Sequence, residues 1–381
     1  MPFQNQTVME QRLELVLLGS KEGANVSQLC KRYGISRKVF YKWLKRYRQK
    51  GEAGLMDLDR RPKVSPRQID VSVEERIKEL RKLNPEWGAR KLRILLEREQ
   101  IEPLPSTSTI GAILHRNGLI KPEKSLQHAP LQRFEYQQPN ELWQMDFKGH
   151  FKLLDNATCY PLTITDDHSR FNLCLSACVN QQSLTVKEML INVFRKYGMP
   201  DMILTDNGSP WGIAGNAATD GEVTLSALEI WLLKLSIKVI HGRAYHPQTQ
   251  GKEERFHRTL KTELLQYEQF RNINHCQNRF DKWRDKYNLE RPHQAIGLKT
   301  PGQLYKHSLK SYPEALPAVE YLPNDILRRV DHRACIRFKG SVFKIGKGLI
   351  DQTVAVRETP TENLCEVYFC NRKIKNIITS K

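Results

Sequence analysis

Three acidic residues occupy positions in the sequence where a carboxylate can do chemistry. Asp146 interrupts an apolar run, Asp206 ends the short apolar run 202–205, and Glu254 opens a helical pattern. An ionised carboxylate inside an apolar strand is costly unless something pairs with it. Several carboxylates that converge suit a hard divalent cation such as Mg²⁺, which prefers oxygen ligands. We therefore predict that Asp146, Asp206 and Glu254 form a metal-binding, catalytic set.

Each acid also has an alternative, purely structural interpretation. Asp146 could lie at the edge of a strand, and Asp206-Asn-Gly208 is by itself a good turn sequence. Glu254 could be an ordinary acid in the first turn of a helix, where it favours the helix dipole. Its neighbour Glu253 is a second choice for the third ligand, but adjacent helical residues point about 100° apart, so only one can face a metal.

The charge of the chain points to a polyanionic partner. There are 61 Lys and Arg against 42 Asp and Glu, which gives a formal net charge of +19. Nucleic acid is the leading partner for such a chain, and a merely solubilising surface is the alternative. Between residues 31 and 63, twelve basic residues stand against three acidic ones. This clustering favours DNA binding by the N-terminal segment.

Residues 1–60 have the pattern of a helix-turn-helix DNA-binding domain. A short helix should end at Gly34, and Ser36 should cap the next one. One face of that second helix is apolar. The opposite face carries the residues that we expect to contact DNA in the major groove: Arg37, Lys38, Tyr41, Lys42 and Lys45. A solvated basic face on a helical bundle is the alternative interpretation.

The remaining sequence divides into four further segments. Residues 66–120 resemble a second helix-turn-helix unit, for which a plain helical spacer is the alternative, and 121–138 form a polar linker. From 139 to 305, strands come first and then alternate with helices, which predicts an α/β domain with a mixed sheet. Residues 326–381 consist of short apolar runs joined by glycines, which predicts a small basic β-barrel.

Three motifs in this order resemble the DDE transposases of bacterial insertion sequences, relatives of the retroviral integrases. They are 143–146 (Trp-Gln-Met-Asp), 204–209 (Leu-Thr-Asp-Asn-Gly-Ser) and 245–258, which contains His-Pro-Gln-Thr-Gln-Gly-Lys-Glu-Glu-Arg. The segment 291–301 is also similar to that family. The resemblance covers about 140–305, and the helix-turn-helix at the start fits the same architecture.

The resemblance implies a ribonuclease-H-like core in which two aspartates and a glutamate hold two Mg²⁺ ions, with Mn²⁺ as a substitute. Matched residue by residue, these are Asp146, Asp206 and Glu254, not Glu253. The implied chemistry is two-metal phosphoryl transfer without a covalent enzyme intermediate. The segment between Asp206 and Glu254 is longer than in retroviral integrases, and the N-terminal zinc module of those enzymes is missing, so no zinc is expected.

The helix that carries Glu254 suggests a further contact with DNA. Gln250, Glu254, Arg258 and Lys261 follow one stripe of a helix. We expect Gln250, Arg258 and Lys261 to grip the DNA end beside the scissile phosphate. A helix with ordinary surface charges is the alternative.

These observations predict a transposase that binds the terminal inverted repeats of a mobile element, cuts its ends and joins them to target DNA. A nuclease of the same fold without strand transfer, and a DNA-binding regulator with an inactive core, are the alternatives. We expect double-stranded DNA as the partner and, by resemblance, a homodimer or larger multimer. No apolar run is long enough to cross a membrane, and the eight cysteines show no disulfide pattern, so we expect a bacterial cytoplasmic, nucleoid-associated protein.

Overall fold

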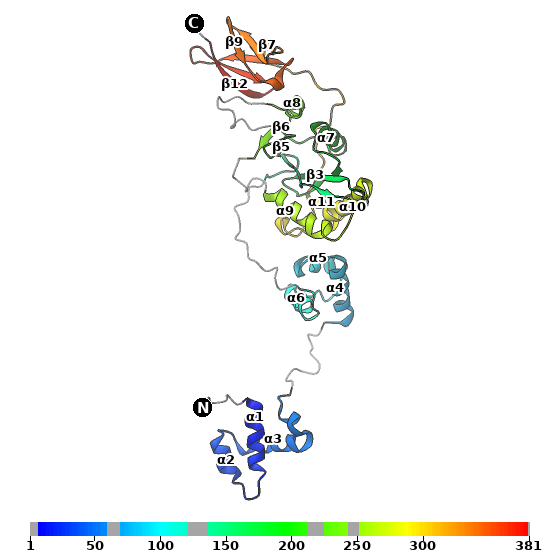
Figure 1. Cartoon of the computed structure of the whole chain (residues 1–381), viewed down its shortest axis with the longest axis vertical. Helices are drawn as coiled ribbons and strands as arrows, with labels where there is room; N and C mark the ends of the chain where they lie inside the picture. Colours follow the sequence, from blue (N-terminus) through cyan, green and yellow to red (C-terminus); the bar gives the residue numbers. More distant parts are fainter. Residues whose placement is uncertain (1–6, 59–68, 121–135, 212–224, 243–250, 380–381) are drawn as a thin grey trace. The chain divides into compact units, whose positions relative to one another are not determined.

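The computed structural model describes residues 7–58, 69–120, 136–211, 225–242 and 251–379 (Figure 1). The chain divides into two compact units, Met1–Ile69 and Asp70–Lys381. Each unit is described by itself below. Among the described residues, no helix is long and apolar enough to cross a membrane.

The first unit is a small helical domain with the predicted helix-turn-helix. Gly34 takes a φ of +64°, which ends the helix before it, and the Ser36 side chain accepts a hydrogen bond from the backbone N–H of Val39. Phe40 and Leu55 are completely buried in its core. The elements are α1 (Val8–Gly19), α2 (Val26–Arg32), α3 (Arg37–Lys50) and the 3₁₀ turn η1 (Gly51–Leu55).

Three further helices open the second unit and confirm the predicted helical segment. Asp70 and Ser106 cap the first and third of them by accepting backbone hydrogen bonds. Their apolar faces meet in a common interior in which Ile77, Leu92 and Ile110 are completely buried. The helices are α4 (Val71–Leu83), α5 (Ala89–Arg98) and α6 (Thr107–Arg116).

A mixed β-sheet follows, as the alternation of strands and helices predicted. Its strands are β1 (Leu142–Phe147), β2 (Phe151–Lys152), β3 (Thr158–Asp166), β4 (Asn172–Cys178), β5 (Met202–Thr205) and β6 (Lys238–His241). The order is β2-β3-β1-β5-β6, with β4 also paired to β3. The pairs of β3 with β1, β2 and β4 are antiparallel, whereas β1, β5 and β6 run parallel.

Helices cover both faces of this sheet (Figure 1). One face packs Trp143, Met145 and Ile164 against α7 (Ser183–Tyr197) and α8 (Ala227–Lys234). The other face contributes Cys159 and Leu175 to a second apolar cluster. That cluster includes side chains of α9 (Gly251–Leu260), of its π-helical continuation η4 (Lys261–Leu265) and of α10 (Ile273–Asp285). The short elements η5 (Lys286–Glu290), η6 (Gln294–Ile296) and α11 (Pro301–Leu304) complete the domain.

The C-terminal segment is all β, but the predicted closed barrel is not confirmed. Its described strands form two separate sheets: the order β12-β11-β10-β7 in one, and the hairpin β8-β9 in the other. The elements are β7 (Ile326–Arg329), β8 (Cys335–Phe338), β9 (Ser341–Lys344), η7 (Lys347–Leu349), β10 (Thr353–Glu358), β11 (Leu364–Phe369) and β12 (Arg372–Ile378).

Helix α8 belongs to two apolar cores at once. Its Trp231 and Leu232 pack in the interior of the mixed sheet, whereas Ile230 and Leu233 join the cluster of the C-terminal sheets. A Cβ placed on Gly348 would lie 1.9 Å from the carbonyl oxygen of Leu225, so the two backbones touch at this point. The C-terminal segment is therefore packed directly onto the end of the mixed-sheet domain.

Candidate active site

The two predicted aspartates lie at the ends of neighbouring parallel strands. Strand β1 pairs with β5 in the register Leu142↔Met202 to Gln144↔Leu204. The same offset, continued by two residues, sets Asp146 opposite Asp206, which directly follows β5. Parallel neighbours in a sheet are about 4.8 Å apart. The sheet register therefore brings these two carboxylates together, although 60 residues separate them in the sequence.

The two glutamates at the start of α9 have different surroundings. Glu253 is buried with only 2% of its surface exposed, whereas Glu254 is exposed. Helix α9 packs against β1, the strand that carries Asp146. Adjacent helical residues point in different directions, so only one of these acids can reach an open site beside the strand ends. Glu254 is the one of the two that is open to solvent.

The electrostatics of Asp146 link the three predicted acids. Burial raises the pKa of Asp146 to about 7, and the negative charges of Asp206 and Glu254 add to this effect. Burial also raises the pKa of Asp206. One side-chain oxygen of Asp206, Oδ1, is buried without a hydrogen-bond partner among the described residues. The acids therefore repel one another, and a cation between them would relieve the repulsion.

Glu253 lies behind this site in a buried polar cluster. The Thr163 hydroxyl is 3.0 Å from Glu253 Oε2, 2.9 Å from His257 Nε2 and 3.0 Å from the carbonyl oxygen of Asp146. Burial raises the pKa of Glu253 to about 8 and lowers that of His257 to about 3. The histidine is therefore neutral at pH 7, and its 3.8 Å approach to Asp146 Oδ2 is not an ion pair.

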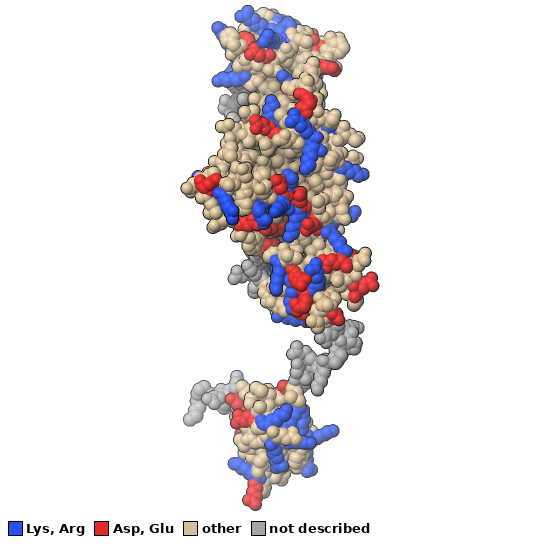
Figure 2. Space-filling model, turned by 90° about the vertical axis from the view of Figure 1, so that its right-hand side faces the viewer, with Lys and Arg blue, Asp and Glu red and all other residues tan. Residues whose placement is uncertain are grey.

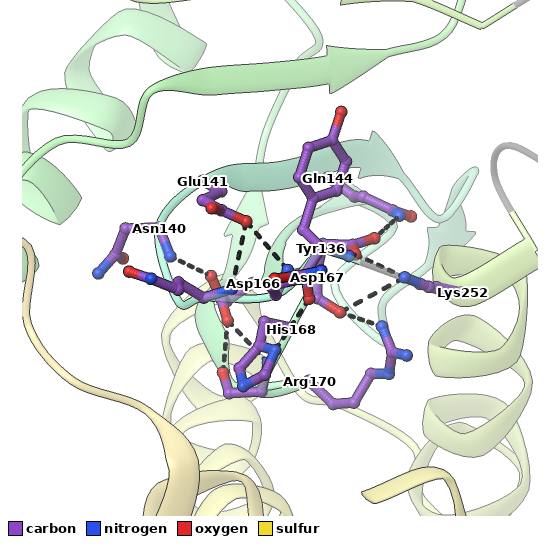
Figure 3. A network of polar contacts seen from close by, with 12 residues as sticks. Tyr136, Asn140, Glu141, Gln144, Asp166, Asp167, His168, Arg170 and Lys252 are labelled. Atoms are coloured by element: carbon purple, nitrogen blue, oxygen red, sulfur yellow. Dashed lines mark hydrogen bonds and ion pairs between the residues drawn. The ribbon is translucent and has the colours of Figure 1, made fainter. Parts of the chain in front are cut away.

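A second network ties β1 and α9, two of the three elements that carry the predicted acids, to one buried residue, Asp167 (Figure 3). Its carboxylate accepts hydrogen bonds of 2.6 Å from Lys252 Nζ, 2.6 Å from Gln144 Nε2 and 3.1 Å from the backbone N–H of Tyr136. Lys252 precedes Glu254 by two residues on α9, and Gln144 precedes Asp146 by two on β1. Asp167 thus links the start of α9 to the strand beside it.

The neighbouring Asp166 fixes the turn that presents Asp167. Its side chain accepts bonds from the backbone N–H groups of Asn140 and Ser169, at 2.7 and 2.8 Å, and burial raises its pKa. Sequence reasoning missed both residues. The signal was two adjacent acids at the end of an apolar strand, but the partner Lys252 lies 85 residues further along the chain.

The donor chemistry of the three acids suits a hard cation. Within the described ranges, however, no three His, Cys, Asp or Glu side chains are already gathered closely enough to hold a metal ion. The buried Asp206 Oδ1 has no hydrogen-bond partner among the described residues, and the charges of Asp206 and Glu254 raise the pKa of Asp146 further. The cysteines 174 and 178, by contrast, are buried among apolar side chains, as expected for core residues.

The five predicted DNA contacts of the first unit lie where the pattern placed them. Phe40, Trp43 and Leu44 of α3 are buried, and the opposite face of the helix is open to solvent. In the view of Figure 2, Lys and Arg side chains spread over the face of the first unit and outnumber the acidic ones. The exposed residues of α3 include all five predicted contacts: Arg37, Lys38, Tyr41, Lys42 and Lys45.

The predicted stripe on α9 is described only in part. Arg258, in the last turn of α9, and Lys261, the first residue of η4, are both exposed. Gln250 lies outside the described residues. Two cationic side chains are thus available on the helix that carries Glu254.

Family models match five stretches of the chain. Two integrase core domain models match residues 136–247 and 235–301. A helix-turn-helix domain model matches 11–63, and a homeodomain-like domain model matches 39–114. The C-terminal domain model of the IS481 family transposases matches 325–378. These matches cover both helical units, the mixed-sheet domain and the C-terminal sheets.

Individual relatives share limited sequence identity with this chain. An uncharacterised 31.7 kDa protein of insertion element IS407 from Burkholderia multivorans is 25% identical over 232 residues, which is 60% of this chain and 78% of that protein. The Gag-Pro-Pol polyprotein of squirrel monkey retrovirus is 34% identical over 126 residues, which is 33% of this chain and 6% of the polyprotein.

Solved structures of retroviral integrases also align. A simian T-cell lymphotropic virus intasome structure covers 80% of this chain and 100% of its own at 18% identity, with a TM-score of 0.38. The HTLV-2 integrase catalytic core, solved with magnesium, covers 44% of this chain and 98% of its own at 18% identity, with a TM-score of 0.33. The integrase core, helix-turn-helix and IS481 C-terminal matches, with the insertion-element relative, assign the chain to the DDE transposases of insertion sequences.

Proposed function

We propose that this transposase binds the terminal inverted repeats of a mobile element, cleaves DNA strands at its ends and joins the 3′-hydroxyl ends to target DNA. One observation carries the proposal. Asp146 and Asp206 continue one strand register, and Asp146 has a pKa of about 7 because of burial and the charges of Asp206 and Glu254. Folding a chain around mutually repelling carboxylates is costly, and metal-dependent phosphoryl transfer explains why they are there.

The residues that would hold Mg²⁺, or Mn²⁺ in its place, are Asp146, Asp206 and Glu254. When bound, two such ions would lower the pKa of a water or a DNA 3′-hydroxyl and stabilise the leaving oxygen. The protein contributes rigidity, since β1 and β5 hold the aspartates and the Asp167 bonds hold α9 beside them. No Ser, Tyr or Cys nucleophile is required.

DNA binding divides between the two units. Helix α3 of the first unit would read the terminal repeat in the major groove through its five exposed residues. Gln250, Arg258 and Lys261 would contact phosphates next to the acids. The proposed domains are residues 1–60, 66–120, 139–305 and 326–381. We also propose that a homodimer or larger multimer pairs the two ends of the element.

A cleavage and joining assay tests the function. Labelled DNA that carries an element end is incubated with the full chain and Mg²⁺, and products are separated on a denaturing gel. Asp146→Asn should leave DNA binding intact and abolish cleavage. Asp201→Asn is the matched control, because it makes the same change at an exposed position just before β5 and should leave cleavage unchanged.

Each outcome selects one interpretation. Cut and joined products support the transposase, cut products without joining indicate a nuclease, and a mobility shift without cutting indicates a regulator with an inactive core. Full cleavage by Asp146→Asn would end the claim of a carboxylate metal site at this position.

A further inference from the structure

A chain of polar contacts connects the C-terminal sheets with the end of strand β5. Nη1 of Arg372, the first residue of β12, is 3.3 Å from Oε1 of Glu229 on α8. The same oxygen of Glu229 is 2.9 Å from Nε2 of His241, the last residue of β6. Nδ1 of His241 is in turn 3.1 Å from the backbone carbonyl oxygen of Asp206. Three side chains thus lead from the C-terminal sheets to the main chain of a predicted metal ligand.

The central pair of this chain is buried and charged. The side chains of His241 and Glu229 are only 8% and 2% exposed. The nearest partner of each ring nitrogen of His241 is an acceptor, the Glu229 carboxylate for Nε2 and the Asp206 carbonyl oxygen for Nδ1. An imidazole that donates from both nitrogens is the cationic form. The bond to Glu229 accordingly raises the pKa of His241.

Glu229 also fixes the start of α8 beside the segment that follows Asp206. Its second oxygen, Oε2, accepts a 2.8 Å hydrogen bond from the backbone N–H of Ser226, the N-cap of α8. The Ser226 hydroxyl donates a 2.9 Å bond to the carbonyl oxygen of Trp211. The segment from Asp206 to Trp211 is therefore anchored at both ends, through His241 and through Ser226, to the same carboxylate.

The C-terminal sheets pack on the helix that carries this carboxylate. Ile230, the residue after Glu229, belongs to the apolar cluster of those sheets. Arg372 pairs with Phe369 across the tight turn that joins β11 to β12, so the hairpin fixes where the arginine begins. Two buried charges are costly to remove from water, and an apolar contact alone could join a helix to a sheet. The charged bridge therefore calls for a role beyond holding the two parts together.

We propose that Arg372, Glu229 and His241 are positioning residues through which the C-terminal sheets set the main chain of Asp206 at the proposed active site. The inference rests on the proposed function, and it gives the C-terminal segment a part in the reaction that is separate from any contact with DNA. Groups that orient a metal ligand from behind typically change activity or metal affinity by about 10- to 100-fold.

The first test needs neither metal nor DNA. Amide hydrogen exchange of the full chain in EDTA is followed by mass spectrometry in peptides that cover residues 202–208. Arg372→Gln should speed exchange there about fivefold, the size expected for one lost hydrogen bond. Arg372→Lys keeps the charge and should restore most of the protection. Arg337→Gln, the same change at an exposed arginine on β8, is the matched control and should leave exchange unchanged.

The second test measures single-turnover cleavage of a pre-bound element end with Mg²⁺, together with the Kd for that end. Glu229→Gln should slow cleavage about tenfold without a change in Kd. Arg372→Gln should slow it about threefold, because its 3.3 Å bond is the longest of the chain and is partly open to solvent. The double variant should be no slower than Glu229→Gln alone, since residues that act in series are not additive.

The outcomes separate the bridge from the function. Cleavage at the wild-type rate in both single variants would overturn the positioning role and leave the function intact. A loss of DNA affinity in Arg372→Gln, with unchanged exchange at 202–208, would show a direct DNA contact and overturn it as well. If the wild-type chain cuts no DNA, the proposed function fails, and the exchange measurement still decides whether the C-terminal sheets hold the end of β5.

Discussion

The ion pair between Lys252 and Asp167 offers the sharpest test of how the site is held together. Its Nζ–Oδ2 distance is 2.6 Å, and the two side chains are 20% and 3% exposed. Lys252→Met keeps most of the length of the side chain and its apolar contacts but removes the charge. The buried carboxylate of Asp167 then loses the ammonium group of Lys252 and keeps its bonds from Gln144 and Tyr136.

The size of the effect follows from this geometry. Removing one partner of a buried ion pair costs about 3–5 kcal/mol. Asp167 keeps its bonds from Gln144 and Tyr136, so the loss belongs at the lower end, about 3 kcal/mol. For a domain of this size, that corresponds to a fall of roughly 6–12 °C in melting temperature. The same change in Lys310, which pairs with Asp201 at the surface with both side chains about half exposed, should cost at most about 1 kcal/mol.

Urea unfolding of the full chain, followed by tryptophan fluorescence, measures both variants. Lys252→Met should also slow cleavage of a bound element end, because α9 loses its bond to the turn after β3, while binding of the repeat by the first unit should not change. If Lys252→Met costs no more than Lys310→Met, or if it cuts at the wild-type rate, the Asp167 network does not position α9.

Two further predictions concern the metal and the DNA end. In the absence of divalent ions, the pKa of Asp146 rises on folding from 3.8 to about 7, so ionisation disfavours the folded state, and stability should fall as the pH rises through that interval. Mg²⁺ binds the deprotonated form, so it should raise the melting temperature more at pH 8 than at pH 6. In Asp146→Asn, the effect of Mg²⁺ on the melting temperature should be the same at both pH values. If Mg²⁺ shifts the melting temperatures of the wild-type and variant proteins equally, the result argues against the site. The double charge reversal Arg258→Glu/Lys261→Glu should reduce cleavage of pre-bound DNA ends at least tenfold with no loss of stability. The control Lys196→Glu, a charge reversal at an exposed site on α7, should leave cleavage unchanged. Undiminished strand cleavage by the double variant would refute the proposed contact with the DNA end.

Much of the fold could be predicted because local signals agree with it. The apolar run 202–205 is strand β5 with the predicted ends, and Ser36 caps a helix as its position indicated. The segment 143–151 belongs to two strands, β1 and β2, and not to one. It is broken at Gly149, which takes a φ of +87°, a conformation that glycine adopts without strain.

The predicted small β-barrel is not confirmed, because alternation identifies strands and their buried faces but does not determine whether the edges of the sheets pair with one another. The candidate site, too, could be predicted only in part. The motifs singled out Asp146, Asp206 and Glu254, and helical geometry already implied that only one of the two glutamates could face the site. The roles of Asp167 and Thr163 depend on partners that are distant in sequence, and no local pattern reveals such partners.

Helix α8 has a consequence for how such a chain can be rebuilt. Because Ile230 and Leu233 complete the interior of the C-terminal sheets, a chain cut before residue 326 would expose these side chains to water. A foreign C-terminal module fused at that point would need a matching surface for the same helix turn. The final segment is therefore not a detachable appendage, and any hybrid transposase built from this one should keep the native C-terminal sheets against α8.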